Sequence, residues 1–107
     1  MALAVATVVA LAGLAGPIGA ASDHAAKSTT AAAVYEDLVR AIGDGRTAPA
    51  LRIAPRSVRR EVQIAWFSAA EHAVLIEEGA YDVCASLGAD SLAALAVLLG
   101  HELAHFY

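Results

Sequence analysis

The residues of this chain with the clearest chemical potential are two histidines four positions apart, His101 and His105, with Glu102 directly after the first. On a helix each residue turns by about 100°, so the two imidazoles would lie about 40° apart on one face. That spacing lets two ring nitrogens reach one tetrahedral Zn²⁺ ion, and the pattern recurs in zinc hydrolases. Glu102 would lie beside the ion, where its carboxylate can accept a proton from a metal-bound water. We therefore predict a zinc site with His101 and His105 as ligands and Glu102 as general base.

The flanks of this motif predict a helix that is covered on two sides. The opposite face of the helical wheel is apolar and predicts a core stripe of Leu92, Leu95, Leu99, Leu103 and Phe106. The histidine side is also apolar, at Ala94, Val97 and Leu98. Buried imidazoles need hydrogen bonds or a metal, and one ion would satisfy both rings. The alternative is that the two histidines only pack or cap within a buried helix.

The segments before the motif predict an α+β fold, a small antiparallel strand pair or sheet packed on helices and ending in the active-site helix. Apolar residues recur at helical spacing from Ala31 to Ile42, before Gly43-Asp44-Gly45. The alternation of Leu51 and Ile53 between two prolines predicts a brief strand at an edge or end of a sheet. Two further strands, 62–67 and 73–76, predict a hairpin-like pair, although 56–67 could also be helical.

Two more elements lead into the motif. Residues 80–87 predict a short helix closed by Gly88, with an inner face of Tyr81, Cys84 and Leu87. Asp90 is a suitable N-cap for the last helix, expected over 91–107. Glu71 and His72, in the loop before the last strand, are expected to be solvated and not to bind metal.

The first 21 residues are uncharged and predict an export signal. An apolar run is followed by Gly16-Pro17 and then by small residues, in the order of a signal peptide and its cleavage site. The other interpretation is an uncleaved N-terminal anchor, which would associate the chain with a membrane. Residues 22–30 are small and polar and predict a linker. The expected location is secreted, periplasmic or in the cell envelope, with residues 31–107 as the N-terminal part of a metallopeptidase domain.

The composition argues against two other classes of protein. Six of the seven basic residues lie between Arg40 and Arg60 without interleaved aromatic residues, so nucleic-acid binding is not expected. A single cysteine, Cys84, excludes an intramolecular disulfide and is interpreted as a small buried side chain.

The stretch Gly100-His-Glu-Leu-Ala-His105, together with the strand pair, the short helix and the acidic cap before it, resembles the gluzincin metallopeptidases. Within them it is similar to the group of the CAAX prenyl endopeptidase and the heat-shock protease. The resemblance covers about residues 50–107 and implies an endopeptidase that uses Zn²⁺ to cleave peptide or protein substrates.

The resemblance also implies a substrate site and a third ligand. In such enzymes an extended substrate adds to the second strand by main-chain hydrogen bonds, which would make Ala73, Val74, Leu75, Ile76 and Glu77 the rim of the cleft. The third ligand of gluzincins, a Glu on a later helix, would fall after Tyr107, so we expect a truncated fragment of such an enzyme, inactive by itself. The alternative is a non-catalytic metal-binding or structural remnant.

Overall fold

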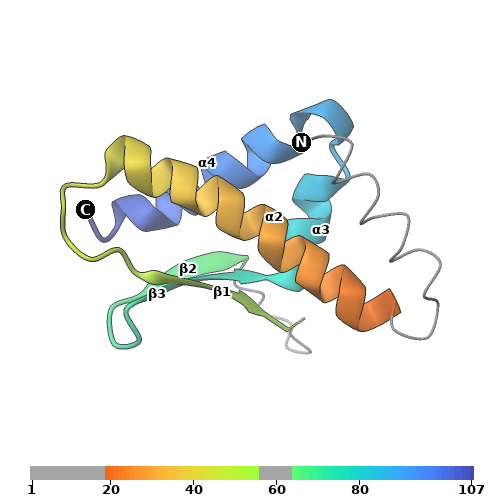
Figure 1. The fold of residues 1–107 in the computed structure, drawn as a ribbon, viewed down its shortest axis with the longest axis horizontal. Coiled ribbons are helices and arrows are strands. Elements are labelled where there is room, and N and C mark those ends of the chain that lie inside the picture. The colour runs from red at the N-terminus through yellow and green to blue at the C-terminus, as the bar shows by residue number, and fades with distance from the viewer. Residues whose placement is uncertain (1–18, 56–63) are drawn as a thin grey trace.

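The computed structural model describes residues 19–55 and 64–107. These residues form three α-helices and a short 3₁₀ turn around a three-stranded sheet, with α2 and α4 on the same face of the sheet (Figure 1). The predicted α+β class is confirmed. The expected export signal lies almost wholly outside the described residues.

Helix α2, Gly19–Ile42, is longer than predicted and includes the segment 22–30 that was expected to be a linker. That interpretation is corrected: the segment contains neither Gly nor Pro, and alanine, the best helix former, flanks it at 20–21 and 31–33. Lys27 anchors it by ion pairs to Glu78 and Asp82 of α3. The predicted end of the helix at Ile42 is confirmed.

The sheet consists of β1, Ala50–Ala54, β2, Ala65–Ser68, and β3, Ala73–Glu77, in the order β1-β3-β2. The predicted edge position of β1 is confirmed, and β2 and β3 form the predicted antiparallel pair. The sequence did not predict that β1 pairs with β3 in parallel. One face of the sheet packs on the helices, through Leu51, Ile53, Ala65, Phe67, Val74 and Ile76.

Helix α3, Glu78–Ala85, follows β3 directly, and it begins and ends two residues earlier than predicted. Cys84 is buried and Tyr81 packs on the core, as expected, but Leu87 is 52% exposed. The helix ends before Leu87, and Gly88 with φ 59 turns the chain into the 3₁₀ turn η2, Gly88–Asp90. Leu87 therefore has no place on an inner helical face.

Helix α4, Ser91–Ala104, carries the motif and crosses α2. Asp90 occupies the predicted N-cap position, but its side chain makes no capping hydrogen bond. Three members of the predicted core stripe, Leu95, Leu99 and Leu103, are buried. The fourth leucine, Leu92, is 57% exposed. The prediction failed there because a helical wheel shows the direction of a side chain around the helix axis and not which helical turns are covered by other elements.

Candidate metal centre

The structure brings together the three predicted site residues, His101, Glu102 and His105, at the C-terminal end of α4. Their candidate ligand atoms all lie within 4.8 Å of one another. The two imidazole rings are 5.1 Å apart between centroids and nearly perpendicular, at 87°. Nitrogens bound to one tetrahedral ion at 2.0–2.1 Å would be about 3.3 Å apart, so small side-chain rotations suffice. The donor set of two imidazoles beside a carboxylate fits Zn²⁺.

The histidine face of α4 is open to solvent, which corrects the prediction that both faces of the helix are covered. The side chain of His101 is 69% exposed, and Val97, one turn earlier, is 75% exposed. His105 is also exposed. The imidazoles therefore satisfy their polar atoms in water, and burial gives no argument for a metal. An ion can nevertheless reach both rings without displacing another part of the described structure.

Glu102 lies deeper than either histidine, with a side chain only 12% exposed. Its Oε1 atom is 3.9 Å from Nε2 of His101, which is beyond hydrogen-bond distance. The carboxylate thus stands next to the open histidine face without being bound to His101. This is the arrangement that a proton acceptor beside a metal ligand requires.

His105 occupies the C-cap of α4, where the helix tightens. Its amide donates to the carbonyl of Glu102 at 3.1 Å, and the amide of Phe106 donates to Leu103 at 3.0 Å. These are bonds to the third preceding residue, whereas an α-helix bonds to the fourth. The second histidine is therefore held by a terminal turn, the part of a helix that frays first.

Two aromatic residues follow His105 and join this turn to the rest of the fold. The Phe106 ring lies 6.0 Å from Phe67 of β2 and 5.1 Å from the His72 ring, edge to face. The guanidinium carbon of Arg46 lies 4.7 Å from the Phe106 centroid and 5.4 Å from that of Tyr107. Three segments distant in sequence thus contact the residues directly after the second predicted ligand.

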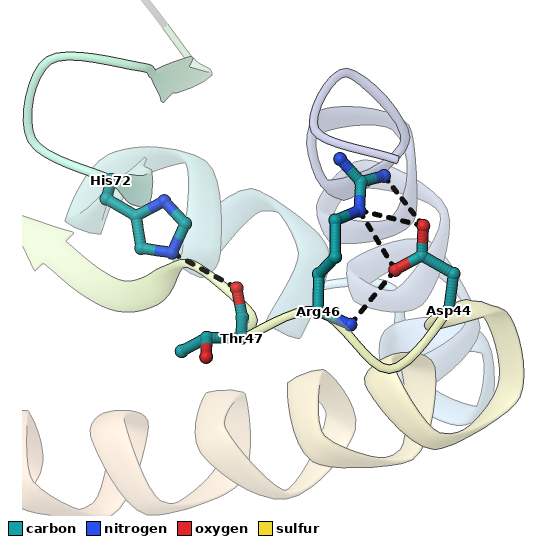
Figure 2. A network of polar contacts seen from close by, with 4 residues as sticks. All are labelled: Asp44, Arg46, Thr47 and His72. Atoms are coloured by element: carbon teal, nitrogen blue, oxygen red, sulfur yellow. Dashed lines mark hydrogen bonds and ion pairs between the residues drawn. The ribbon is translucent and has the colours of Figure 1, made fainter.

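Asp44 and Thr47 fix the two polar side chains of this arrangement (Figure 2). Both carboxylate oxygens of Asp44 accept hydrogen bonds from Arg46 Nε, at 3.0 and 2.8 Å. The Arg46 hydrogen bonds keep the pKa of the Asp44 carboxyl below its ordinary value. His72 Nε2 lies 3.1 Å from the Thr47 carbonyl and can donate to it. His72 is exposed as expected, but sequence reasoning missed both its contacts and those of Arg46.

The structure contradicts the predicted substrate rim at Ala73, Val74, Leu75, Ile76 and Glu77. These residues form β3, the central strand, which is paired with β1 on one side and β2 on the other. All five are buried. A substrate strand needs free main-chain donors and acceptors, and β3 has none to offer.

Among the described residues the free sheet edge beside α4 belongs to β2, which pairs only with β3. The Glu77 amide donates to the Ile64 carbonyl at 3.0 Å, so Ile64 and Glu77 face each other as a hydrogen-bonded pair. Because such pairs alternate along an antiparallel ladder, Ala65 and Phe67 direct their main-chain groups to the free edge. Phe67 also contacts Phe106 at the end of α4.

A second polar group, which the sequence did not indicate, lies between α2 and α3. Lys27 Nζ is 2.8 Å from Asp82, 3.0 Å from Glu78 and 3.4 Å from Asp23. Hydrogen bonds to Asp82 and Glu78 raise the pKa of the lysine. The local signal was the spacing of Asp23 and Lys27, four residues apart on a helix, but the partners on α3 are distant in sequence. This group anchors α2 on α3.

Comparisons with protein-family models, with curated proteins and with solved structures each returned no match to this chain. Within residues 19–55 and 64–107, no helix combines the length and the apolar character that crossing a membrane requires.

Proposed function

We propose that this chain provides the zinc-binding helix of a metalloendopeptidase, in which His101 and His105 bind the ion and Glu102 is the general base. The observation that supports it best is the approach of three candidate ligand atoms within 4.8 Å on an exposed face of α4. The resemblance of the motif and its flanks to gluzincin peptidases gives the reaction class. In those enzymes a third ligand, a Glu on a later helix, completes the usual three protein ligands.

Each residue has a separate task in this proposal. Bound zinc supplies a Lewis acid that polarises the peptide carbonyl and acidifies a water molecule. His101 and His105 orient the ion on the open side of α4. Glu102 accepts the proton of the attacking water at its carboxylate and later delivers it to the leaving amine. Its partial burial keeps this carboxylate close to the ion and limits the positions that it can adopt.

The substrate is an extended peptide or protein segment that adds to the free edge of β2. Ala65 and Phe67 would exchange main-chain hydrogen bonds with it. In this proposal the substrate pairs with β2, an outer strand that contacts the end of α4, and not with the central strand β3. The apolar segment 1–21 supports an exported protein, secreted, periplasmic or in the cell envelope.

The metal centre is tested by titrating the purified chain with Zn²⁺ or Co²⁺ and following binding by calorimetry and Co²⁺ absorption. We expect one ion per chain, with a strong loss of affinity in His101→Ala and in His105→Ala. The matched control is His24→Ala, an exposed histidine on α2. Unchanged binding in both site variants would contradict the proposed centre.

Activity separates the enzyme from a non-catalytic metal-binding protein. With zinc and the third protein ligand of the proposal in place, the protein should cleave an unstructured peptide and lose this activity with a chelator. Zinc binding through His101 and His105 without any cleavage would favour the non-catalytic alternative.

A further inference from the structure

We infer that Arg46 is a positioning residue for the second metal ligand, acting through Phe106 and Tyr107 on the turn that carries His105. The inference rests on the proposed metal centre and concerns how its geometry is maintained. His105 lies at the C-cap of α4, where its own amide and that of Phe106 bond to the third preceding residue and the Tyr107 amide bonds to the fourth, Leu103, at 3.3 Å. A ligand pair four residues apart needs this turn to keep its shape, since fraying would carry one imidazole away from the other.

The turn is not held by polar contacts of its own terminal side chain. The Tyr107 hydroxyl is buried and has no hydrogen-bond partner in the described part of the chain. It lies against Gly43, where an added Cβ would approach it to 3.2 Å. Tyr107 and Phe106 are therefore fixed by ring contacts, and the Arg46 guanidinium lies over both rings.

Arg46 is itself held in place, so that it can hold the rings. Asp44 accepts from its Nε and lies 2.8 Å from its terminal nitrogen, and the Arg46 amide donates to Asp44 at 3.1 Å. The planar guanidinium is thereby oriented, and a planar cation interacts with aromatic rings better than a flexible ammonium group does. The guanidinium contacts with Phe106 and Tyr107 join the loop after α2 to the residues after α4. Figure 2 shows the Asp44 contacts that hold Arg46.

Phe106 is also contacted by His72, whose ring meets it edge to face at 5.1 Å. The His72 backbone has φ 49, an uncommon conformation for a residue other than glycine. Its Nε2 contact with Thr47 ties the β2–β3 loop to the same segment that carries Arg46. Phe106 thus contacts Arg46, His72 and Phe67, and these contacts restrict the conformations that the His105 backbone before it can adopt.

The test compares metal affinity and metal geometry in Arg46→Ala and in the matched control Arg40→Ala. Arg40 is an exposed arginine of α2 that forms an ion pair with Asp37. We expect Arg46→Ala to weaken Co²⁺ binding about tenfold, the low end of the effect of removing an outer-shell partner, and to change the Co²⁺ absorption spectrum. Arg40→Ala should change neither the Co²⁺ affinity nor the spectrum. Arg46→Lys should bind Co²⁺ more tightly than Arg46→Ala but less tightly than wild type.

Coupling to His105 distinguishes positioning from a general effect on folding. In a His105→Ala background, where the second ligand is already missing, Arg46→Ala should cause no further loss of the residual affinity. Equal losses in both backgrounds, or wild-type affinity and spectrum in Arg46→Ala, would overturn the inference while the metal centre stands. A wild-type chain that binds no ion would contradict the proposed function first. Should Arg46→Ala fail to fold, Arg46→Met keeps the aliphatic stem on the rings and is compared in the same way.

Discussion

The Oε1 atom of Glu102 lies 3.9 Å from Nε2 of His101, and the two side chains differ sharply in exposure, 12% against 69%. The imidazole is open to solvent, while most of the Glu102 side chain is covered. Because no hydrogen bond joins them, the carboxylate can be altered without disturbing the histidine. This allows metal binding and proton transfer to be tested separately.

Substitution of Glu102→Gln should leave zinc affinity within a few-fold of wild type and lower peptide hydrolysis by about 10²–10⁴-fold, because the amide cannot accept the proton of water. The measurement is the rate at which the zinc-loaded protein cleaves a peptide substrate, with the zinc content determined on the same sample. Glu36→Gln, at an exposed position on α2, is the control and should be as active as wild type. Hydrolysis that persists in Glu102→Gln would contradict the assigned mechanism.

Truncation of Leu99→Ala should destabilise the domain by about 2–5 kcal/mol, because this side chain is fully buried on the core side of α4. Leu92→Ala, on the same helix but 57% exposed, should change the free energy of unfolding by less than about 0.5 kcal/mol. Urea denaturation of both variants gives the comparison. Similar losses at the two positions would show that the first turn of α4 is covered in solution.

Replacement of Lys27→Met removes the cation from among Asp23, Glu78 and Asp82 and should cost about 1–2 kcal/mol, since the carboxylates are partly exposed and screened. Folding raises the Lys27 pKa, so its contribution is fully present below its ordinary value of 10.5 and is lost only at higher pH. The difference from wild type should therefore vary little with this lysine from about pH 6 to 9, and should shrink with added salt. Arg40→Met is the matched exposed control. No difference in urea denaturation would contradict the anchoring role.

Tyr35→Phe tests a buried hydrogen bond with a defined pH dependence. The Tyr35 hydroxyl donates to the Pro49 carbonyl at 2.8 Å, and its loss should cost about 1–2 kcal/mol at neutral pH. Burial raises the pKa of Tyr35 from 10.0 to about 12, so its stabilising contribution is present below pH 10 and is lost as the pH rises through about 12.

Denaturation at increasing pH, combined with tyrosinate absorption, measures this effect. Wild type should lose stability at alkaline pH as Tyr35 ionises. Tyr35→Phe should lack this loss, whereas Tyr81→Phe should show it as wild type does. Identical alkaline profiles for wild type and Tyr35→Phe would contradict the assignment.

The local features of the fold could be predicted because they depend on short periodicities. The four-residue spacing of His101 and His105 determines their common helical face, and the apolar run 73–76 indicates a strand. The central position of β3 could not be predicted in this way. It results from parallel pairing with β1, more than twenty residues earlier, and neither strand encodes its partner in its own pattern.

Two other errors have the same origin. Residues 22–30 have the composition of a linker, yet Lys27 finds its partners on α3, and that contact is absent from any local window of the sequence. The apolar residues beside His101 indicated burial, but Val97 is exposed because no described element covers that face of α4. Composition indicates which side chains a segment could bury, but it does not indicate whether another element of the fold packs against them.

The burial of Cys84 gives the domain an intrinsic reporter of its own motions. The chain has a single cysteine, 8% exposed, and burial raises the pKa of its thiol, so the reactive thiolate is both scarce and shielded. Cys84 belongs to the core cluster that α3 shares with α2, β3 and α4, so an alkylating reagent should reach the sulfur faster when these elements open. The alkylation rate of the unmodified protein thus measures the local opening of the elements that support the metal-binding helix.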